Sequence, residues 1–205
     1  MENTAGNSGK TGVSIIGVAV RASLLFFLLC GIVYPLAMTS VAQTLMPDRA
    51  NGSLIRDAEG NVVGSELIGQ SFSDPAFFQS RVSSIDYNAA GSGSSNYAPS
   101  NPDLLQRMRN SIDAWKKDNP DVPTSVLPIS LITNSGSGLD PHLTPESAEV
   151  QIPRISKLTG IPVDDLEQLV RRHTEGRDLG LIGEPRVNVL MLNLELQAME
   201  NSRNR

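Results

Sequence analysis

The sequence predicts an α+β protein, with one N-terminal transmembrane helix followed by a soluble domain of about three helices and a small sheet. Apolar residues are concentrated between Val13 and Met46, which sets a membrane part apart from the rest. Beyond that block, short segments with alternating or helical periodicity follow one another between turn-forming residues, as in a mixed fold. The length of 205 residues suits one ordinary domain with an appendage.

The apolar block is long enough to cross a bilayer as a single helix. From Ala22 to Pro47 there are 26 residues without a formal charge. As a helix they extend about 39 Å, more than the ~30 Å hydrocarbon core requires. Pro35 interrupts the run, which membrane helices tolerate. We therefore assign residues 13–46 to a transmembrane helix in the lipid bilayer. Residues 1–12, rich in Gly, Ser, Thr and Asn, are expected to form a disordered tail.

Two kinds of processing compete with a retained anchor. A signal peptide would be cleaved after Ser40-Val41-Ala42, and a lipoprotein would need small residues before Cys30. The apolar run continues past a usual signal core and leucines precede Cys30, so we expect the anchor to be retained. Charge leaves the orientation open, because basic residues lie on both sides of the span: Lys10, Arg21, Arg49 and Arg56.

The soluble part is acidic and free of cysteine. After residue 46 its formal net charge is −6, which argues against nucleic acid or anionic lipid as a partner. The one cysteine, Cys30, lies in the apolar block. The soluble domain therefore has no disulfide, no thiolate nucleophile and no cysteine-based metal site.

We place the soluble domain at residues 47–200, with residues 201–205 as a tail. Its first predicted element is a β-hairpin, in which Leu54–Arg56 and Val62–Ile68 flank a turn that contains glycine. Residues 88–102 are rich in Gly, Ser, Asn and Pro and predict a loop.

A helix and a strand are expected next. Asn101-Pro102 supplies an N-cap and a proline at the first helical position, apolar residues recur at helical spacing, and Asn119-Pro120 stops the helix. The following apolar stretch, Val126–Thr133, predicts a strand.

Two more helices and a last strand complete the expected domain. Thr144-Pro145 starts the second helix, which Pro153 should kink and a glycine should end, and Pro162 opens the third. In Val187–Leu196 alternate residues are leucine, which favours a strand over the helix that the same segment also permits.

No grouping of residues in the sequence indicates catalysis. His142 and His173 are the only histidines, and the Asp140-Pro141-His142 triplet is interpreted as a turn in preference to a metal site. The segment 8–12 resembles a phosphate loop only superficially, because no strand precedes it. The glycine-rich segment 91–96 is interpreted as a surface loop in preference to an anion nest. We expect no catalytic residue and no metal site, and thus no enzyme activity in this chain alone.

Several ordered segments are familiar from a known family. They are Gly31–Leu36, Ala50–Ile55, Gly64–Phe72, Pro99–Pro102, Ser137–His142, Gln151–Arg154 and Val187–Leu190. With these segments the chain resembles, from about Ser14 to Met199, the C subunit of the potassium-transporting Kdp ATPase (KdpC). Two departures concern loops: Arg81-Val82-Ser83 replaces the usual Arg-Pro-Ser, and the loop Ala90–Asn96 is one residue longer.

The resemblance implies an accessory subunit of a high-affinity, ATP-driven potassium uptake complex in the bacterial inner membrane. Its partners would be KdpA, a channel-like potassium-binding subunit, KdpB, the P-type ATPase subunit, and KdpF, a small membrane peptide. The N-terminus would be cytoplasmic and the soluble domain periplasmic. Family members are described as raising the ATP affinity of the hydrolytic subunit, as a catalytic chaperone.

The expected influence on ATP conflicts with an external domain, because ATP is cytoplasmic. Such a domain acts on ATP binding only through conformational coupling, and ATP is then held by the partner subunit. For a direct nucleotide contact the expected residue is Gln151, whose amide both donates and accepts. The competing interpretation of Gln151 is a polar residue on a helix surface. The competing function is a free-standing, membrane-anchored module that binds a small ligand with the 88–102 loop.

Overall fold

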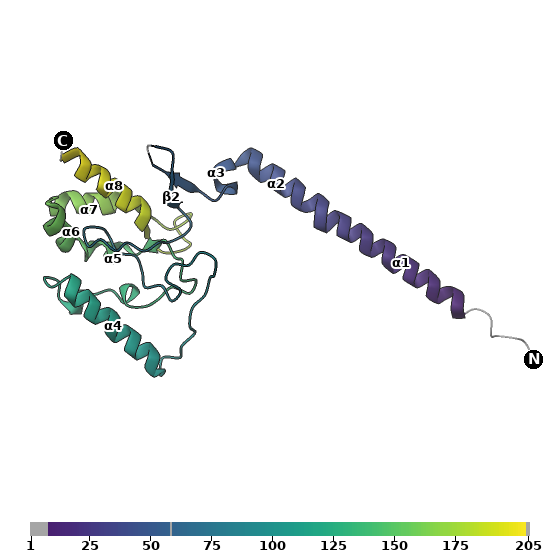
Figure 1. The fold of residues 1–205 in the computed structure, drawn as a ribbon, viewed down its shortest axis with the longest axis horizontal. Coiled ribbons are helices and arrows are strands. Elements are labelled where there is room, and N and C mark those ends of the chain that lie inside the picture. Colours follow the sequence, from purple (N-terminus) through teal and green to yellow (C-terminus); the bar gives the residue numbers. More distant parts are fainter. Residues whose placement is uncertain (1–7, 58, 204–205) are drawn as a thin grey trace, which may run out of the picture. The chain divides into compact units, whose positions relative to one another are not determined.

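The computed structural model describes residues 8–57 and 59–203, which fall into two compact units that meet between Ser53 and Leu54. The first unit is a continuous helical segment: α1 (Ser8–Leu28), a π-helical turn (Leu29–Val33) and α2 (Tyr34–Leu45), followed by the short helix α3 (Pro47–Ala50) (Figure 1).

The first unit contains the predicted transmembrane helix. Residues Ile15–Leu45 form one helix that is apolar and long enough to cross a bilayer, and its most apolar 18-residue window buries none of its residues inside the chain. Helix α1 already begins at Ser8, so residues 8–12 of the expected tail are helical. Residues 1–7 lie outside the described part of the chain.

The π-helical turn follows from the proline that comes after it. Pro35 has no N–H group, so the carbonyl of Gly31 loses its partner four residues along the helix. The helix widens by one residue just before this point, where the Tyr34 N–H donates to the Leu29 carbonyl five residues back. The span therefore continues through the proline without a break.

The second unit contains two small antiparallel sheets. Strands β1 (Leu54–Arg56) and β2 (Val62–Ser65) form the predicted hairpin, with Leu54 opposite Ser65. The other sheet has the order β3-β5-β4, from β3 (His142–Leu143), β4 (Thr174–Glu175) and β5 (Arg186–Asn188). Its central strand, β5, pairs with both neighbours.

The second unit also contains helices, and the α+β class is confirmed. They are α4 (Pro102–Asp118), α5 (Pro145–Glu149), α6 (Ile152–Thr159), α7 (Val163–Arg172) and α8 (Val189–Arg203), of which α5 and α8 contact β5. The Asn101 side chain caps α4 by accepting from the Asp103 N–H, as predicted. The expected kink near Pro153 is the break between α5 and α6, and Gly160 ends α6 with φ +71°.

Two strand predictions are wrong. Over residues 126–133 the chain forms two 3₁₀ turns, Thr124–Val126 and Ile129–Leu131, each preceded by a proline whose carbonyl accepts a local N–H. Over residues 187–196 only the start is a strand, and helix α8 begins at Val189. Asn188 supports that start, since its side-chain oxygen accepts from the Met191 N–H.

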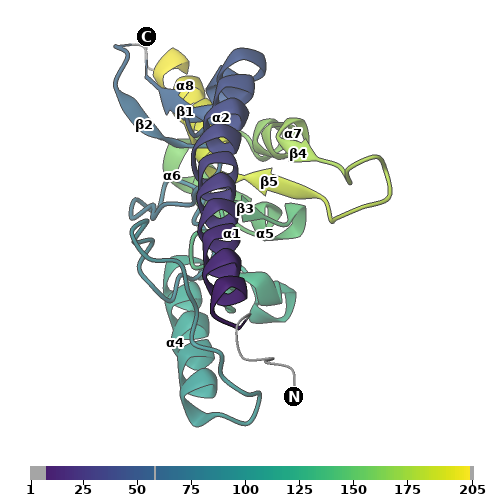
Figure 2. The ribbon, with the colours of Figure 1, turned by 90° about the vertical axis from the view of Figure 1, so that its right-hand side faces the viewer.

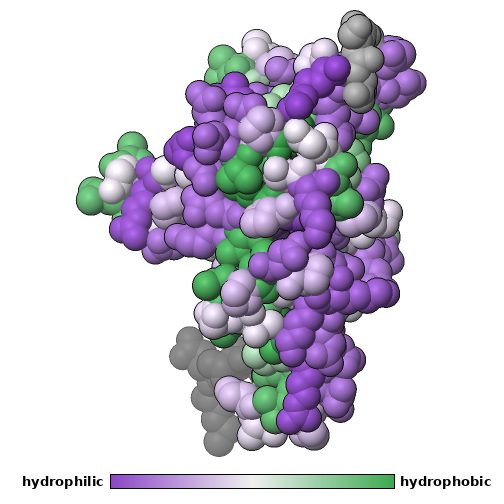
Figure 3. Space-filling view, turned by 90° about the vertical axis from the view of Figure 1, so that its left-hand side faces the viewer, coloured by the Kyte–Doolittle hydropathy of each residue, from purple (hydrophilic) through white to green (hydrophobic). Residues whose placement is uncertain are grey.

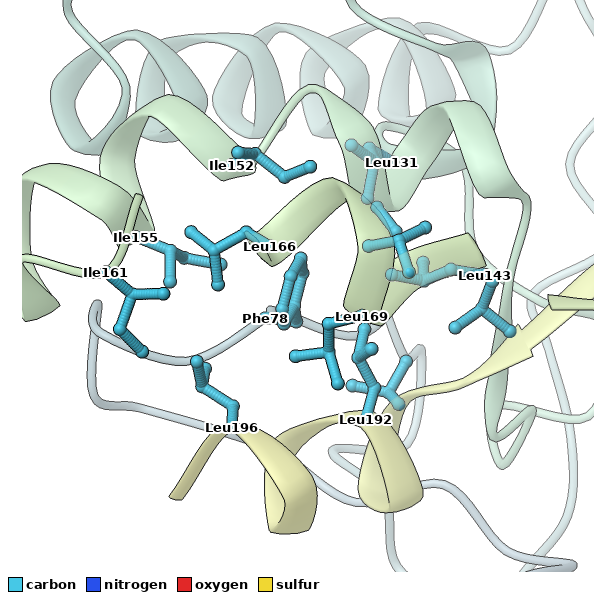
Figure 4. Close-up of a cluster of buried hydrophobic side chains, with 14 of the residues drawn as sticks. Phe78, Leu131, Leu143, Ile152, Ile155, Ile161, Leu166, Leu169, Leu192 and Leu196 are labelled. Carbon is cyan, nitrogen blue, oxygen red and sulfur yellow. The ribbon is translucent and has the colours of Figure 1, made fainter. Parts of the chain in front are cut away.

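The core lies where α6, α7 and α8 meet the irregular segment around Phe78 (Figure 4). Its members are aliphatic apart from two aromatic rings. Fully buried side chains include Phe78, Ile155, Ile161, Leu166, Leu169, Leu192 and Leu196. Every member belongs to the second unit, which therefore has a core of its own.

Candidate functional site

The segment 71–80 is buried in part and forms no helix or strand, so side chains satisfy its backbone. Asn193 of α8 binds both polar groups of Phe78: its Oδ1 accepts from the Phe78 N–H at 2.9 Å and its Nδ2 donates to the Phe78 carbonyl at 2.9 Å. The Asn193 side-chain amide therefore bonds to the Phe78 backbone as a neighbouring strand would. We call residues 75–79, with the side chains that hold them, the clamped segment.

Gln151 holds the next residue in the same way. Its Oε1 accepts from the Gln79 N–H at 2.7 Å, and its Nε2 donates to the carbonyls of Gln79 at 3.2 Å and Ser147 at 2.9 Å. The side chain is fully buried, so the interpretation of Gln151 as a helix-surface residue is wrong. A nucleotide would reach this amide only after these hydrogen bonds had broken.

Arg154, one turn further along, completes the clamped segment. Its guanidinium donates to the carbonyls of Pro75 and Phe77, to Asn119 Oδ1 at 3.0 Å and to Gln151 Oε1 at 2.8 Å. Burial lowers the pKa of Arg154, although two aspartates oppose this, and the group stays protonated. The four acceptors of the guanidinium are uncharged carbonyl and amide oxygens.

Sequence reasoning missed Arg154 and Asn193. The signal for Arg154 was its spacing of three from Gln151, which places both on one helix face. Asn193 carried no such signal, because its partner Phe78 lies 115 residues away in the chain.

A hollow of about 320 Å³ lies beside Arg154. The exposed Lys157–Asp121 ion pair, at 2.8 Å, is part of its lining. The lining combines three cations with two carboxylates and apolar groups: Pro75, Lys117, Asp118, Asn119, Pro120, Asp121, Val122, Arg154, Lys157 and Leu158. The charges within it are close to balanced.

The Asp140-Pro141-His142 triplet forms the turn that its sequence predicted. Asp140 accepts from the His142 N–H at 3.0 Å and pairs with Arg81 at 2.8 Å. Burial raises the pKa of Asp140, but the hydrogen bonds from His142 and Arg81 outweigh it and hold that pKa below the usual range. Among the described residues, no three His, Cys, Asp or Glu side chains are grouped as metal ligands.

The glycine-rich loop is attached to another loop of the same domain. The Gly93 N–H donates to the Ser137 carbonyl at 2.9 Å, and Ser92 donates to the same oxygen. Asn134 binds Ser94 across the same contact. The predicted 88–102 loop is therefore a surface loop supported by residues 134–137.

The second histidine takes part in a different polar cluster. His173 Nε2 lies 2.5 Å from Glu195 Oε2, and Arg172 binds the other carboxylate oxygen at 2.8 Å. These contacts join the end of α7 to α8. The polar side chains therefore bind one another and the backbone, and the arrangement forms a stable scaffold.

Comparison with known proteins gives matches over about nine-tenths of the chain. The family model described as KdpC, K⁺-transporting ATPase, c chain, matches residues 16–198. The potassium-transporting ATPase KdpC subunit of Bacillus cereus (strain AH820) is 58% identical over 184 residues, or 90% of this chain and 95% of the relative. That of Bacillus mycoides (strain KBAB4) is 58% identical over 186 residues, covering 91% and 96%.

Proposed function

The chain belongs to the KdpC family, the c chains of K⁺-transporting ATPases, and from this we propose that it is the accessory subunit of an ATP-driven potassium uptake complex. The observation that carries the proposal is a match over nearly the whole length: 58% identity covers 90% of this chain and 95% of its relative. At that coverage both the anchor and the domain are shared with the relatives.

The partners we propose are KdpA, the channel-like subunit, KdpB, the P-type ATPase subunit, and KdpF, a small membrane peptide. Two observations support assembly. The candidate membrane helix buries none of its most apolar window within the chain, so its surface is open to lipid or to other helices. The domain has its own core and can therefore keep its shape beside a partner.

We propose that the chain is non-catalytic and raises the ATP affinity of KdpB, as a catalytic chaperone. The proposed position of the domain is outside the inner membrane, with the N-terminus in the cytoplasm. The effect on ATP then passes through the conformation of the complex. The competing route, a nucleotide contact through Gln151, requires the buried amide to leave its hydrogen bonds to Gln79 and Ser147.

Co-expression with the three partner genes tests the proposal. A tag on this chain should recover KdpA, KdpB and KdpF from detergent extract, and omission of the chain should raise the KM of the complex for ATP. Recovery of the chain alone would favour a free-standing module that binds a small ligand with the 88–102 loop.

Labelling with a membrane-impermeant maleimide tests the proposed orientation. The native thiol is first removed by Cys30→Ser, and Asn201→Cys then places one thiol at the exposed end of α8. Intact spheroplasts should label this cysteine fully. Labelling only after lysis would place the domain in the cytoplasm.

A further inference from the structure

A narrow arm projects from the sheet of the second unit and ends in apolar side chains. The arm is the β4–β5 hairpin, with its loop over residues 176–185 (Figure 2). Its end is hydrophobic while its base is polar (Figure 3). Leu179 is 91% exposed, Leu181 83% and Ile182 64%. We call these three residues the apolar tip.

Hydrogen bonds and ion pairs fix the shape of the arm. The Asp178 N–H donates to the Ile182 carbonyl at 2.8 Å, and the Ile182 N–H returns a bond to Asp178 at 3.0 Å. Arg177 pairs with Glu184 at 3.1 Å across the loop. These contacts join the two sides of the loop on either side of the tip.

The backbone at the tip also carries strain. Leu179 has φ +54°, a left-handed conformation that leucine rarely adopts. Two glycines, Gly180 at φ +73° and Gly183 at φ +85°, turn the chain on either side of the other tip residues. A strained leucine with 91% of its surface exposed contributes little to the fold of this chain. Contact with another molecule would remove this apolar surface from water.

The charges around the tip favour a protein over a lipid surface. Arg186 pairs with Glu175 at 2.9 Å and with Asp178 at 3.5 Å, and Arg177 pairs with Glu184. Both arginines of the arm are therefore committed to carboxylates, and the arm has no Trp or Tyr to sit among headgroups. An apolar centre bordered by polar groups is the usual anatomy of a protein–protein contact.

We propose that the apolar tip inserts into an apolar pocket on the membrane-external surface of a partner subunit of the same complex. The proposal rests on the proposed function, which supplies the partner. The pocket needs apolar walls for Leu179, Leu181 and Ile182, and a polar rim that meets the paired charges at the base of the arm. The arm is thus a second attachment point, separate in the chain from the membrane helix.

Photo-crosslinking identifies the occupant directly. A benzophenone amino acid replaces Leu181 in the full chain, the four subunits are expressed together, and native membranes are irradiated. A covalent adduct with a partner subunit is expected, and peptide mass spectrometry locates its site. Adducts with lipid alone, or with a second copy of this chain alone, would overturn the proposal.

Substitution tests whether the contact contributes to assembly. The variant Leu179→Asn, Leu181→Ser and Ile182→Ser removes the apolar tip, and asparagine tolerates the left-handed backbone. The matched control, Val126→Ser with Ile129→Ser, removes two side chains that are 53% and 69% exposed elsewhere on the domain. The tip variant should recover at least about tenfold less partner subunit after stringent washing, because each buried apolar anchor contributes substantially.

The outcomes separate this inference from the proposed function. Full recovery of partners by the tip variant, or an equal loss in the control, would overturn the role of the arm while the complex itself stands. Failure of the unsubstituted chain to recover any partner would overturn both. Thermal unfolding of both variants in detergent identifies a loss caused by misfolding, and in that case the crosslinking result decides.

Discussion

Two buried amides replace a missing strand beside Phe78 and Gln79. Asn193 and Gln151 each both accept from and donate to one backbone residue of the clamped segment. Neither role could be predicted from the sequence, because Asn and Gln are mostly exposed and the partners lie 115 and 72 residues away. The sequence singled out Gln151 for the right property, a group that donates and accepts, but could not show that the backbone already uses it.

The first prediction separates a structural from a nucleotide-binding role for Gln151. Gln151→Ala should lower the free energy of unfolding by about 2–4 kcal/mol, because it leaves buried backbone groups of Gln79 without partners. Asn193→Ala is the matched control, since it does the same to Phe78. Denaturant titration in detergent measures both losses, and we expect them to be similar.

The KM of the assembled complex for ATP completes this comparison. Conformational coupling predicts that the two variants change this KM alike. A rise confined to Gln151→Ala would instead assign the nucleotide contact to Gln151.

The second prediction concerns the acid stability contributed by Asp140. Its pKa is lowered in the folded state from an ordinary value of 3.8, so its stabilising effect is fully present above that pH and is lost as the pH falls through the folded pKa. Asp140→Asn should cost about 1–3 kcal/mol at pH 7, where a charge-assisted hydrogen bond to Arg81 is lost. The difference between variant and unsubstituted protein should shrink below about pH 4.

Asp121→Asn is the control for this measurement. Its ion pair with Lys157 has the same 2.8 Å separation, but both side chains are more than 60% exposed. Exposed ion pairs contribute little to stability, so the free energy of unfolding of this variant should stay within about 1 kcal/mol of that of the unsubstituted protein at every pH. An equal loss in the two variants would show that burial of the Arg81–Asp140 pair adds nothing.

At the scale of elements, local signals located helices better than short strands. The N-cap and proline at Asn101-Pro102 and the proline before α7 act within a few residues, and both helices begin there. The strand prediction for residues 187–196 was wrong because α8 buries a wide face. Its buried residues include Val189, Leu192, Asn193 and Leu196. With so many apolar positions, the same segment fits both an alternating and a helical pattern. Burial of that kind depends on the whole fold.

The third prediction tests the close approach of two segments at Gly69. A Cβ atom there would lie 2.5 Å from the backbone oxygen of Asp140, and backbone cannot move aside as a side chain does. Gly69→Ala should therefore lower the free energy of unfolding by about 1–3 kcal/mol through overpacking. Gly136→Ala is the control, because nothing lies within 4 Å of its Cβ position. Equal stabilities of the two variants would contradict the close contact.

At the scale of the whole molecule, the division into an anchor and a domain follows from composition. The apolar block predicted a long apolar helix, and the helix Ile15–Leu45 has the length and composition that a membrane span needs. The α+β class was also predictable, because periodicity and turn residues mark the elements. The clamped segment could not be predicted, because it depends on long-range contacts. The exposed arm could not be predicted either, because it depends on the strained backbone at Leu179.

The last prediction treats the membrane helix as an assembly element. Gly31 lies in the π-helical turn, where the Phe27 ring is 3.6 Å from its Cβ position, and small residues of this kind let helices approach closely in lipid. Gly31→Leu should weaken recovery of the partner subunits, because a bulky side chain separates the helices while insertion is unaffected. Gly17→Leu is the control, since Gly17 lies in the same span and nothing within the chain is close to its Cβ position.

A poly-leucine replacement of the whole span should weaken recovery more strongly than Gly31→Leu. The chimera keeps the length and hydrophobicity that anchoring needs, but it loses the small residues and the π-helical turn that give the surface its shape. Recovery of the partners and potassium uptake at limiting potassium measure the two consequences. Because the arm is a separate attachment point, the chimera should retain part of the complex, and combining it with the tip variant should abolish recovery. A chimera that recovers all partners and supports full uptake would reduce the helix to an anchor and leave specificity to the domain.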